Sequence, residues 1–417
     1  MKRNRYVGAV LVLVLVVLGA TSYLIEKRSV VHAATAMAPK FEVDPLWPKP
    51  LPNHWILGQT IGVSVDAQDH VWIIHRAGSL EDNEKHATTS PQTAQCCAPA
   101  PPILEFDQQG NLLRHWGGPG NGYDWPESNH GITVDYKGNV WIGGNSGVAA
   151  GGGGGRGKQA GKAKGGDPTL DEGQTVGVEP YNDNMVLKFT QDGKFLMQIG
   201  KPGRSKGSND PENLRRPAKI FVDQQTNEAF IADGYGNHRV IVYDAETGKY
   251  KRHWGAYGKK PDDGLKLPSR EELVQGARPE GFNNPVHAVV VTNDDLVYVA
   301  DRSNNRLQVF KLDGTFVREV FISRNTLQAE GTVHGFAVSP DKDQRFLYVV
   351  DGSNKAIRIL NRQTLDILAS VGGHAGHNAR EFFHIHSVAS DSKGNLFLGE
   401  VNNGQRYYRY AFKGMSK

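Results

Sequence analysis

The sequence predicts an all-β protein, a six-bladed β-propeller, and three observations support this fold class. The 417-residue chain contains 49 glycines and 21 prolines, which indicates many turns between short strands. No long amphipathic helical pattern accompanies them. One pattern also recurs six times: an apolar strand that ends in Asp or a substitute, a short turn, a second apolar strand and a polar turn. Because one such unit cannot bury both faces alone, the copies are expected to pack around a common axis.

The six copies follow one another at spacings of about 50 to 90 residues. They are IGVSVDAQDHVWIIHR (61–76), HGITVDYKGNVWIGGN (130–145), AKIFVDQQTNEAFIADGYGNHRVIVYD (218–244), HAVVVTNDDLVYVADRSNNRLQVFKLDG (287–314), HGFAVSPDKDQRFLYVVDGSNKAIRIL (334–360) and HSVASDSKGNLFLGEVNNGQRYYRYAF (386–412). Third strands such as RVIVYD alternate apolar and polar residues, so we expect them to be half-exposed.

The propeller is expected to span residues 41–412, with long insertions inside its blades. Residues 147–174 form a glycine-rich, low-complexity insertion that no packed core would use. Two further loops cover 77–102 and 201–216. The first of these carries the two cysteines, Cys96 and Cys97. As neighbours they form either a vicinal disulfide or two cysteines with no chemical role, and they cannot link distant segments.

Residues 1–36 have the order of an export signal, basic and then apolar. Lys2, Arg3 and Arg5 precede an apolar run over 7–25, and Ala34-Thr35-Ala36 offers a small-residue cleavage site. The run is also long enough to span a bilayer, so a cleaved signal peptide and an N-terminal membrane anchor are both open. Either way the body of the protein is expected to be periplasmic or extracellular. The formal charge of +4 is spread along the chain, which disfavours nucleic acid as a partner.

Histidines recur at one register position when the copies are aligned by their first strand. The residues five positions before the Asp site are Ile61, His130, Ala218, His287, His334 and His386. First strands line the channel of a propeller, so alternate blades place His130, His287 and His386 at the corners of a triangle. Three imidazoles around one point, with a fourth position open, make the ligand set of a catalytic zinc site. His334 breaks this symmetry and is a neighbour of the site, an alternative ligand or a substrate contact.

Arginines and a tyrosine follow the second strand at a shared register. Arg76 and Arg302 stand there in the first and fourth copies, and Tyr235 lies one residue further along in the third. For either arginine alone, the favoured interpretation is a salt bridge between blades. Beside a channel metal, a pair of guanidinium groups is suited to hold a carboxylate.

The turns DGYGNHR and ADRSNNR resemble NHL repeats. Together with HRAG, NHGITVD, PVHAVVV and HSVAS, they make residues 57–412 similar to the peptidyl-α-hydroxyglycine α-amidating lyases. That family cleaves the N–C bond of a peptidyl hydroxyglycine to give a peptide amide and glyoxylate. The resemblance implies that His130, His287 and His386 bind zinc, that Tyr235 is the catalytic base or proton carrier, and that Arg76 and Arg302 handle a peptide or small-molecule substrate.

The chain departs from that family at several positions. Ser387 stands where the family has an acidic residue associated with structural calcium, so the resemblance favours zinc over calcium as the cofactor. His384 replaces a methionine, and Gly236 replaces a disulfide cysteine. We expect no copper-binding monooxygenase half.

Two other functions remain as alternatives to the lyase. One is a non-catalytic extracytoplasmic propeller that binds a protein or glycan through its loops. The other is a calcium-dependent, lactonase-like hydrolase, which would need carboxylates and amides in the channel instead of histidines.

Overall fold

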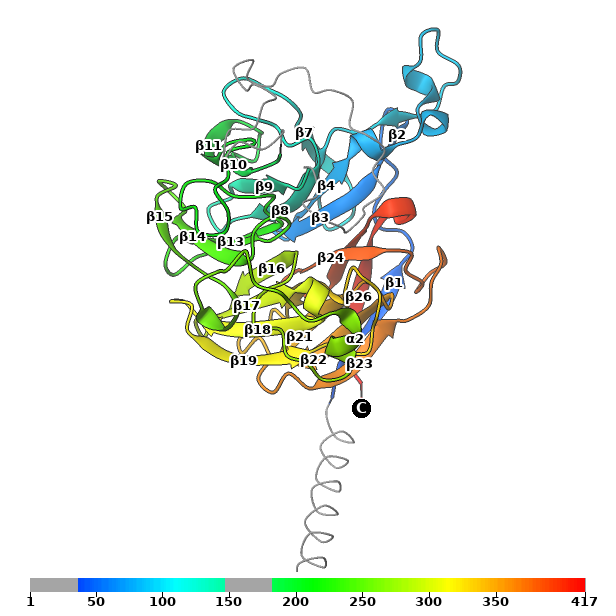
Figure 1. Ribbon diagram of the computed structural model, residues 1–417. Coiled ribbons are helices and arrows are strands. Elements are labelled where there is room, and N and C mark those ends of the chain that lie inside the picture. Colours follow the sequence, from blue (N-terminus) through cyan, green and yellow to red (C-terminus); the bar gives the residue numbers. More distant parts are fainter. Residues whose placement is uncertain (1–36, 147–181, 417) are drawn as a thin grey trace, which may run out of the picture. The chain divides into compact units, whose positions relative to one another are not determined.

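The computed structural model describes residues 37–146 and 182–416 (Figure 1). The expected signal or anchor at 1–36 and the expected insertion at 147–174 lie outside these residues. One compact unit comprises Phe41–Phe412, and the propeller is formed there.

Six four-stranded sheets confirm the predicted fold class. From the inner strand outward, the first three sheets are β3 (Gln59–Val65), β4 (Val71–Arg76), β6 (Ile103–Phe106) and β7 (Leu112–Trp116); β8 (Asn129–Val134), β9 (Val140–Gly144), β10 (Met185–Phe189) and β11 (Phe195–Gly200); and β12 (Lys219–Asp223), β13 (Glu228–Asp233), β14 (Arg239–Asp244) and β15 (Tyr250–Trp254). The last three are β16 (Val286–Val291), β17 (Leu296–Asp301), β18 (Arg306–Lys311) and β19 (Phe316–Phe321); β20 (Val333–Val338), β21 (Phe346–Asp351), β22 (Ala356–Asn361) and β23 (Ile367–Gly372); and β24 (Ile385–Ser390), β25 (Leu396–Glu400), β26 (Tyr407–Met415) and β1 (Pro39–Asp44).

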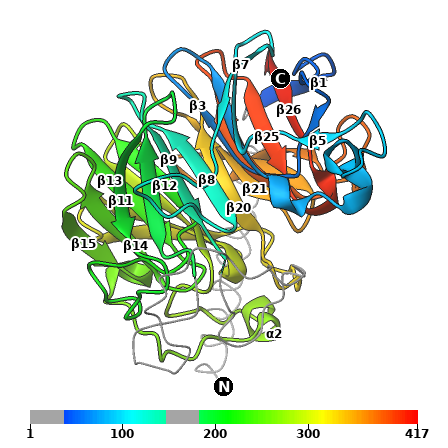
Figure 2. The same cartoon turned by 90° about the horizontal axis from the view of Figure 1, so that it is seen from above.

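The sheets close into a ring. Each first strand contacts the first strands of its two neighbours, in the order β3, β8, β12, β16, β20, β24 and back to β3. The sixth sheet takes its outermost strand from the start of the chain, and Figure 2 shows β1 (blue) beside β26 (red). Within this blade the Arg409 guanidinium pairs with the Asp44 carboxylate, with an Nε–Oδ2 distance of 3.1 Å. The repeat pattern did not predict this closure by β1.

The hydrophobic core is divided into clusters that lie between adjacent blades. One joins Phe230 and Val240 of the third blade to Val289 and Val299 of the fourth, and similar clusters join other neighbouring blades. Third strands between two such clusters are therefore covered on both faces. In β14 every residue but the last is buried, so the expectation of a half-exposed strand was wrong there, whereas β26 of the sixth blade is mostly half-buried or exposed. The fourth strands, such as β7, carry the alternation of more and less exposed residues instead.

The Asp that ends the first strand explains the repeat by its hydrogen bonds. The Asp66 carboxylate accepts the main-chain N–H groups of Gln68 and His70, and its second oxygen accepts the indole N–H of Trp72. Asp135 bonds Trp141 in the same way in the second blade. A carboxylate in this position satisfies turn donors and fixes the start of the next strand.

A second recurring feature is an acidic residue at the end of the second strand that pairs with an arginine at or near the start of the third strand. Asp233 accepts from Nε of Arg239 at 2.8 Å and from the Asn237 amide at 2.7 Å, with both Asp233 and Arg239 fully buried. Three further pairs repeat this arrangement: Asp301–Arg306, Asp351–Arg358 and Glu400–Arg406. These pairs account for the D-x-x-x-N-x-R-like turns of the sequence.

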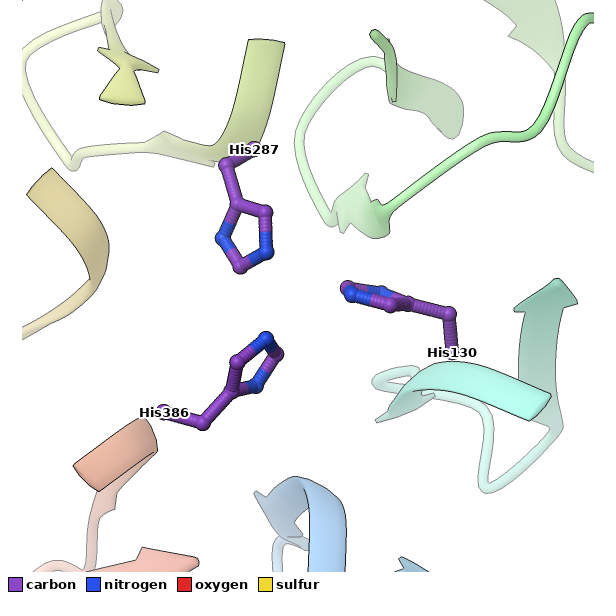
Figure 3. A group of neighbouring side chains, drawn as sticks. All are labelled: His130, His287 and His386. Carbon is purple, nitrogen blue, oxygen red and sulfur yellow. The ribbon is translucent and has the colours of Figure 1, made fainter. Parts of the chain in front are cut away.

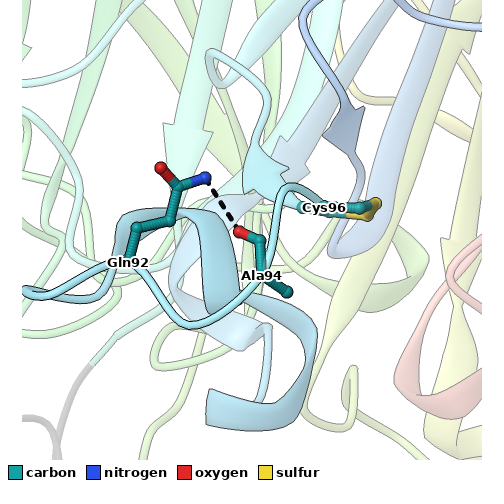
Figure 4. The surroundings of a disulfide bond; sticks show 4 residues. Gln92, Ala94 and Cys96 are labelled. Carbon is teal, nitrogen blue, oxygen red and sulfur yellow. Dashed lines mark hydrogen bonds between the residues drawn. A yellow bond between two sulfur atoms is a disulfide. The ribbon is translucent and has the colours of Figure 1, made fainter.

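The loop at 77–102 is built of short elements. These are the 3₁₀ turns η1 (Ala77–Ser79), η2 (Asp82–Glu84) and η3 (His86–Thr88), and the strand β5 (Ala98–Pro99). β5 pairs in parallel with β2 (Trp55–Ile56), which precedes the first blade. Cys96 and Cys97 form a vicinal disulfide, and the nearby Gln92 amide donates to the Ala94 carbonyl at 2.8 Å (Figure 4).

The remaining helical elements are short. Within the described residues they are η4 (Ala256–Gly258), α2 (Arg270–Val274), η5 (Arg302–Asn304) and η6 (Asn402–Gly404). Across residues 37–146 and 182–416, the chain forms no helix with the length and apolar character that a membrane crossing requires.

The buried ion pairs yield a stability prediction. Replacement of the arginine in Arg239→Leu strands the Asp233 carboxylate without its partner, and the free energy of unfolding should fall by about 3–5 kcal/mol. Chemical denaturation monitored by tryptophan fluorescence measures this change. In the control Lys137→Ala, which removes an exposed pair with Glu246, the denaturation midpoint should not move. An equal effect of the two substitutions would contradict the role of the buried pair.

His75 predicts an acid-dependent loss of stability. Its ring is fully buried, with Nδ1 accepting from the Gly58 N–H and Nε2 donating to the Pro101 carbonyl. Burial lowers the pKa of His75 from 6.5 to about 4. The unfolded chain therefore binds a proton more readily, and stability falls as the pH drops from 6.5 towards 4, by up to about 3 kcal/mol for this residue. His75→Gln should flatten the pH dependence of the denaturation midpoint in that window, and an unchanged slope would contradict this account.

Candidate metal centre

Three histidines from alternate blades meet in the channel. His130 lies on β8, His287 on β16 and His386 on β24, and all are at least 95% buried. Their ring centroids are 4.7 to 5.1 Å apart, and one ligand nitrogen of each lies within 4.8 Å of the others. The rings point toward one shared space (Figure 3).

Each of these rings is oriented by the blade that follows it. Nδ1 of His130 donates to the carbonyl of Ala218 at 2.8 Å, and Nδ1 of His386 donates to the carbonyl of Ile61 at 2.9 Å. Nδ1 of His287 bonds to the carbonyl of His334. The accepting residues occupy the same register position in the next blade. A donated Nδ1–H fixes the tautomer and leaves the Nε2 lone pair free to bind a metal.

The electrostatics keep the three imidazoles neutral. Burial lowers the pKa of His130, His287 and His386 well below that of a free imidazole, and the positive charge of Arg302 lowers the pKa of each further. Neutral imidazole is the form that coordinates a divalent ion. The donor set, its orientation and its protonation state therefore fit a divalent metal ion with nitrogen ligands.

Tyr235 reaches the same point from the turn after β13. Its hydroxyl lies 3.0 Å from Nε2 of both His130 and His287. The backbone of this turn is held by Arg216, whose carbonyl accepts the Tyr235 N–H at 3.2 Å and whose guanidinium donates to the Tyr235 carbonyl at 2.6 Å. The phenol is thus positioned beside the space where the three nitrogens converge.

The two arginines lie close to the site but differ in their bonding. Arg76, at the end of β4, donates to the Asn129 carbonyl and to the side chains of Gln59 and Asn145 at 2.8 to 3.1 Å. Arg302 donates from Nη1 to the Tyr235 hydroxyl at 3.2 Å, and its buried Nε has no hydrogen-bond partner in the described part of the chain. Arg76 is therefore locked in place by the protein, whereas Arg302 has a donor left for a ligand.

The structure also gives a reason for one departure from the amidating lyases. A side chain at position 236, where those proteins were expected to carry a cysteine, would bring its Cβ within 2.4 Å of Cγ of Arg215. A larger residue at position 236 would therefore require the Arg215 side chain to move.

Some functional features were not apparent from the sequence. The main-chain carbonyls that orient the histidines carry no side-chain signal. Glu330 was also missed, because it lies in a loop outside the repeat pattern, yet its carboxylate is 3.1 Å from Nε2 of His384. Only residues that recur at the same position of the repeat could be identified from the sequence.

Comparison with known proteins agrees with the resemblance expected from the sequence. Residues 282–310 match the model of the NHL repeat. Peptidylglycine alpha-amidating monooxygenase of Rattus norvegicus is 22% identical over 351 residues, which cover 83% of this chain and 30% of that protein. NHL repeat-containing protein 3 of Mus musculus is 27% identical over 280 residues, or 66% of this chain and 58% of that protein. The expected similarity to NHL propellers is confirmed.

A protein that is named as a lyase alone, without a monooxygenase, is also among the similar proteins. Peptidyl-alpha-hydroxyglycine alpha-amidating lyase 2 of Drosophila melanogaster is 24% identical over 358 residues, which cover 84% of this chain and 71% of that protein. By contrast, the chain spans less than two thirds of the rat monooxygenase and of the mouse NHL protein.

The convergence of the three rings predicts the effect of removing one of them. His386→Ala should weaken zinc binding by at least about 100-fold, because even an outer-sphere partner of a metal ligand contributes about 10- to 100-fold. Zinc content after dialysis against a chelator measures the loss, with circular dichroism as the check on folding. The control is His86→Ala in the loop at 77–102, which should retain zinc. Stoichiometric zinc in His386→Ala would contradict the assignment.

Proposed function

We propose that this protein is a zinc-dependent lyase that cleaves the N–C bond of an α-hydroxyglycine, in a peptide or a related small molecule, and releases glyoxylate. The observation that carries the proposal is the Tyr235 hydroxyl, which lies within 3.2 Å of two inward-facing imidazole nitrogens and of the Arg302 guanidinium. The similarity to a protein named as an amidating lyase supports the same reaction class.

The reaction requires a proton to move from oxygen to nitrogen. The substrate, R–CO–NH–CH(OH)–COO⁻, becomes the amide R–CO–NH₂ and glyoxylate, OHC–COO⁻. Tyr235 would relay this proton: its hydroxyl would give a proton to the amide nitrogen as the C–N bond breaks and would take up the proton of the substrate hydroxyl as the carbonyl forms. A zinc ion held by His130, His287 and His386 would supply Lewis-acid polarisation beside this oxygen. No net proton is gained or lost.

The arginines suit a substrate that carries a carboxylate. Arg302 combines a fixed charge with an unpaired Nε–H, so it would hold the carboxylate that becomes part of glyoxylate. Arg76 already donates to three acceptors of the protein, so its contribution would be mainly the positive charge it fixes near the site. A metal and two guanidinium groups together would favour an anionic substrate over a neutral one.

The location and partners that we propose follow from the N-terminal sequence. The basic and apolar order of residues 1–36 supports export to the periplasm or the extracellular space, with or without attachment to the membrane. A small molecule or peptide is the proposed partner, and nucleic acid is not.

The phenol provides the direct test of the lyase. Tyr235→Phe keeps the ring and removes the hydroxyl, so glyoxylate release from a hydroxyglycine-terminated peptide should fall by about 10²- to 10⁴-fold. Glyoxylate is measured by derivatisation and chromatography. The matched control is Tyr257→Phe, because Tyr257 also accepts a hydrogen bond from an arginine, Arg306 at 2.7 Å, but lies outside the metal centre.

Two results would contradict this function. One is the absence of glyoxylate from the zinc-loaded wild-type protein, which would favour a binding propeller or another substrate. The other is equal loss of activity in the two tyrosine variants, which would indicate a structural effect instead of proton transfer.

A further inference from the structure

A second cluster of potential ligands lies beside the three histidines. Glu330 is in the loop before β20, His334 is on β20, and His384 directly precedes β24. One donor atom from each lies within 4.8 Å of the other two. Nε2 of His384 is 3.1 Å, and Nε2 of His334 is 3.8 Å, from the same Glu330 oxygen. The rings of His334 and His386 are 6.0 Å apart, so the two clusters are adjacent.

The two ring nitrogens of His334 make no hydrogen bond within the described residues and could bind a ligand. The residue is 1% exposed. In contrast, the buried ring of His75 has both nitrogens bonded. An imidazole buried with both nitrogens unpaired is unfavourable, so a ligand that accepts a nitrogen lone pair would relieve that cost.

The surroundings are shaped to hold this ring. A Cβ at Gly352 would lie 2.7 Å from Nδ1 and from a ring carbon of His334, so the ring fits only against a glycine. The main-chain carbonyl of His334 also binds Nδ1 of His287. The side chain of His334 is thus fixed by the same strand that orients a ligand of the first site.

The other two members complete a recognisable donor set. The Asn402 amide N–H donates to Nδ1 of His384 at 2.8 Å and so holds the ring in place. For Nε2 to bind a metal, this amide would turn over and accept from Nδ1–H through its oxygen. The Glu330 side chain is 39% exposed, which gives an ion a path from solvent. The negative charge of Glu330 would compensate the positive charge of a cation that binds near Arg302.

A third cluster in the described residues serves as a comparison, because its carboxylates are already bound by donors of the protein. Asp66, His70 and Glu105 also bring donor atoms together, but protein donors already bind the carboxylates. Asp66 accepts from Trp72, and Glu105 accepts from Arg114 at 2.7 Å. In the described part of the chain, none of these three residues has a buried polar atom without a hydrogen-bond partner, so the group is a structural ion-pair network.

We propose that Glu330, His334 and His384 bind a second divalent metal ion, next to the three-histidine site. Two imidazoles and one carboxylate, with positions left open, suit Zn²⁺, Co²⁺, Fe²⁺ or Mn²⁺. The second ion lies on the side of the channel where Glu330 meets solvent. This inference goes beyond the proposed lyase activity and does not depend on it.

Metal stoichiometry of the full chain tests the proposal. The protein is stripped with a chelator, loaded with Co²⁺ and dialysed, and the bound metal is measured by mass spectrometry of the elements. We expect two equivalents in the wild type, and one in each of Glu330→Gln, His384→Asn and His130→Ala. The matched control His70→Gln, in the ion-pair network, should keep two.

Two outcomes would overturn the second site. One is a single equivalent in the wild type that His130→Ala removes and Glu330→Gln leaves in place; the first metal site would then stand without the second. The other is two equivalents in the wild type that persist in both Glu330→Gln and His384→Asn. Because Glu330 is in a partly exposed loop, its variant tests the ligand without disturbing the core.

Discussion

The hydrogen bond from Nδ1 of each channel histidine to the carbonyl of the next blade is the interaction on which the site depends. His130, His287 and His386 each use this bond, and the acceptors stand at the same register one blade further on. An imidazole that donates Nδ1–H outward must present Nε2 inward. The ring of blades therefore sets both the position and the tautomer of the three ligands, and one blade alone would set neither.

This dependence links the site to the closure of the propeller. The acceptor for His386 is Ile61, which belongs to the first blade, so the bond spans the junction between the last repeat and the first. That junction is held by contacts between β24 and β3, while β1 completes the sixth sheet from outside. The buried pairs such as Asp233 and Arg239 hold the turn that carries Tyr235 in the third blade. The features that repeat from blade to blade thus support both the stability of the propeller and the geometry of the candidate metal site.

The sequence predicted what recurs and missed what does not. The six-bladed fold and the alignment of histidines followed from repetition, because residues at one register of a propeller share one level of the channel. The strand β1 has no repeat before it and no turn signal that ties it to β26, so its place was not predictable. Third strands such as β14 were misjudged because packing between blades covers both faces, whatever their alternation of residue types. Glu330 gave no signal, since only the folded loop brings it to His334 and His384.

The proposed metal site requires that the inward nitrogens of His130, His287 and His386 bind one ion. X-ray absorption at the zinc edge of the purified, zinc-loaded Glu330→Gln protein measures the ligands of the first site directly. We predict three imidazole nitrogens at about 2.0–2.1 Å and one light-atom ligand in the fourth position. A spectrum without imidazole scattering, or a protein that takes up no zinc, would contradict it.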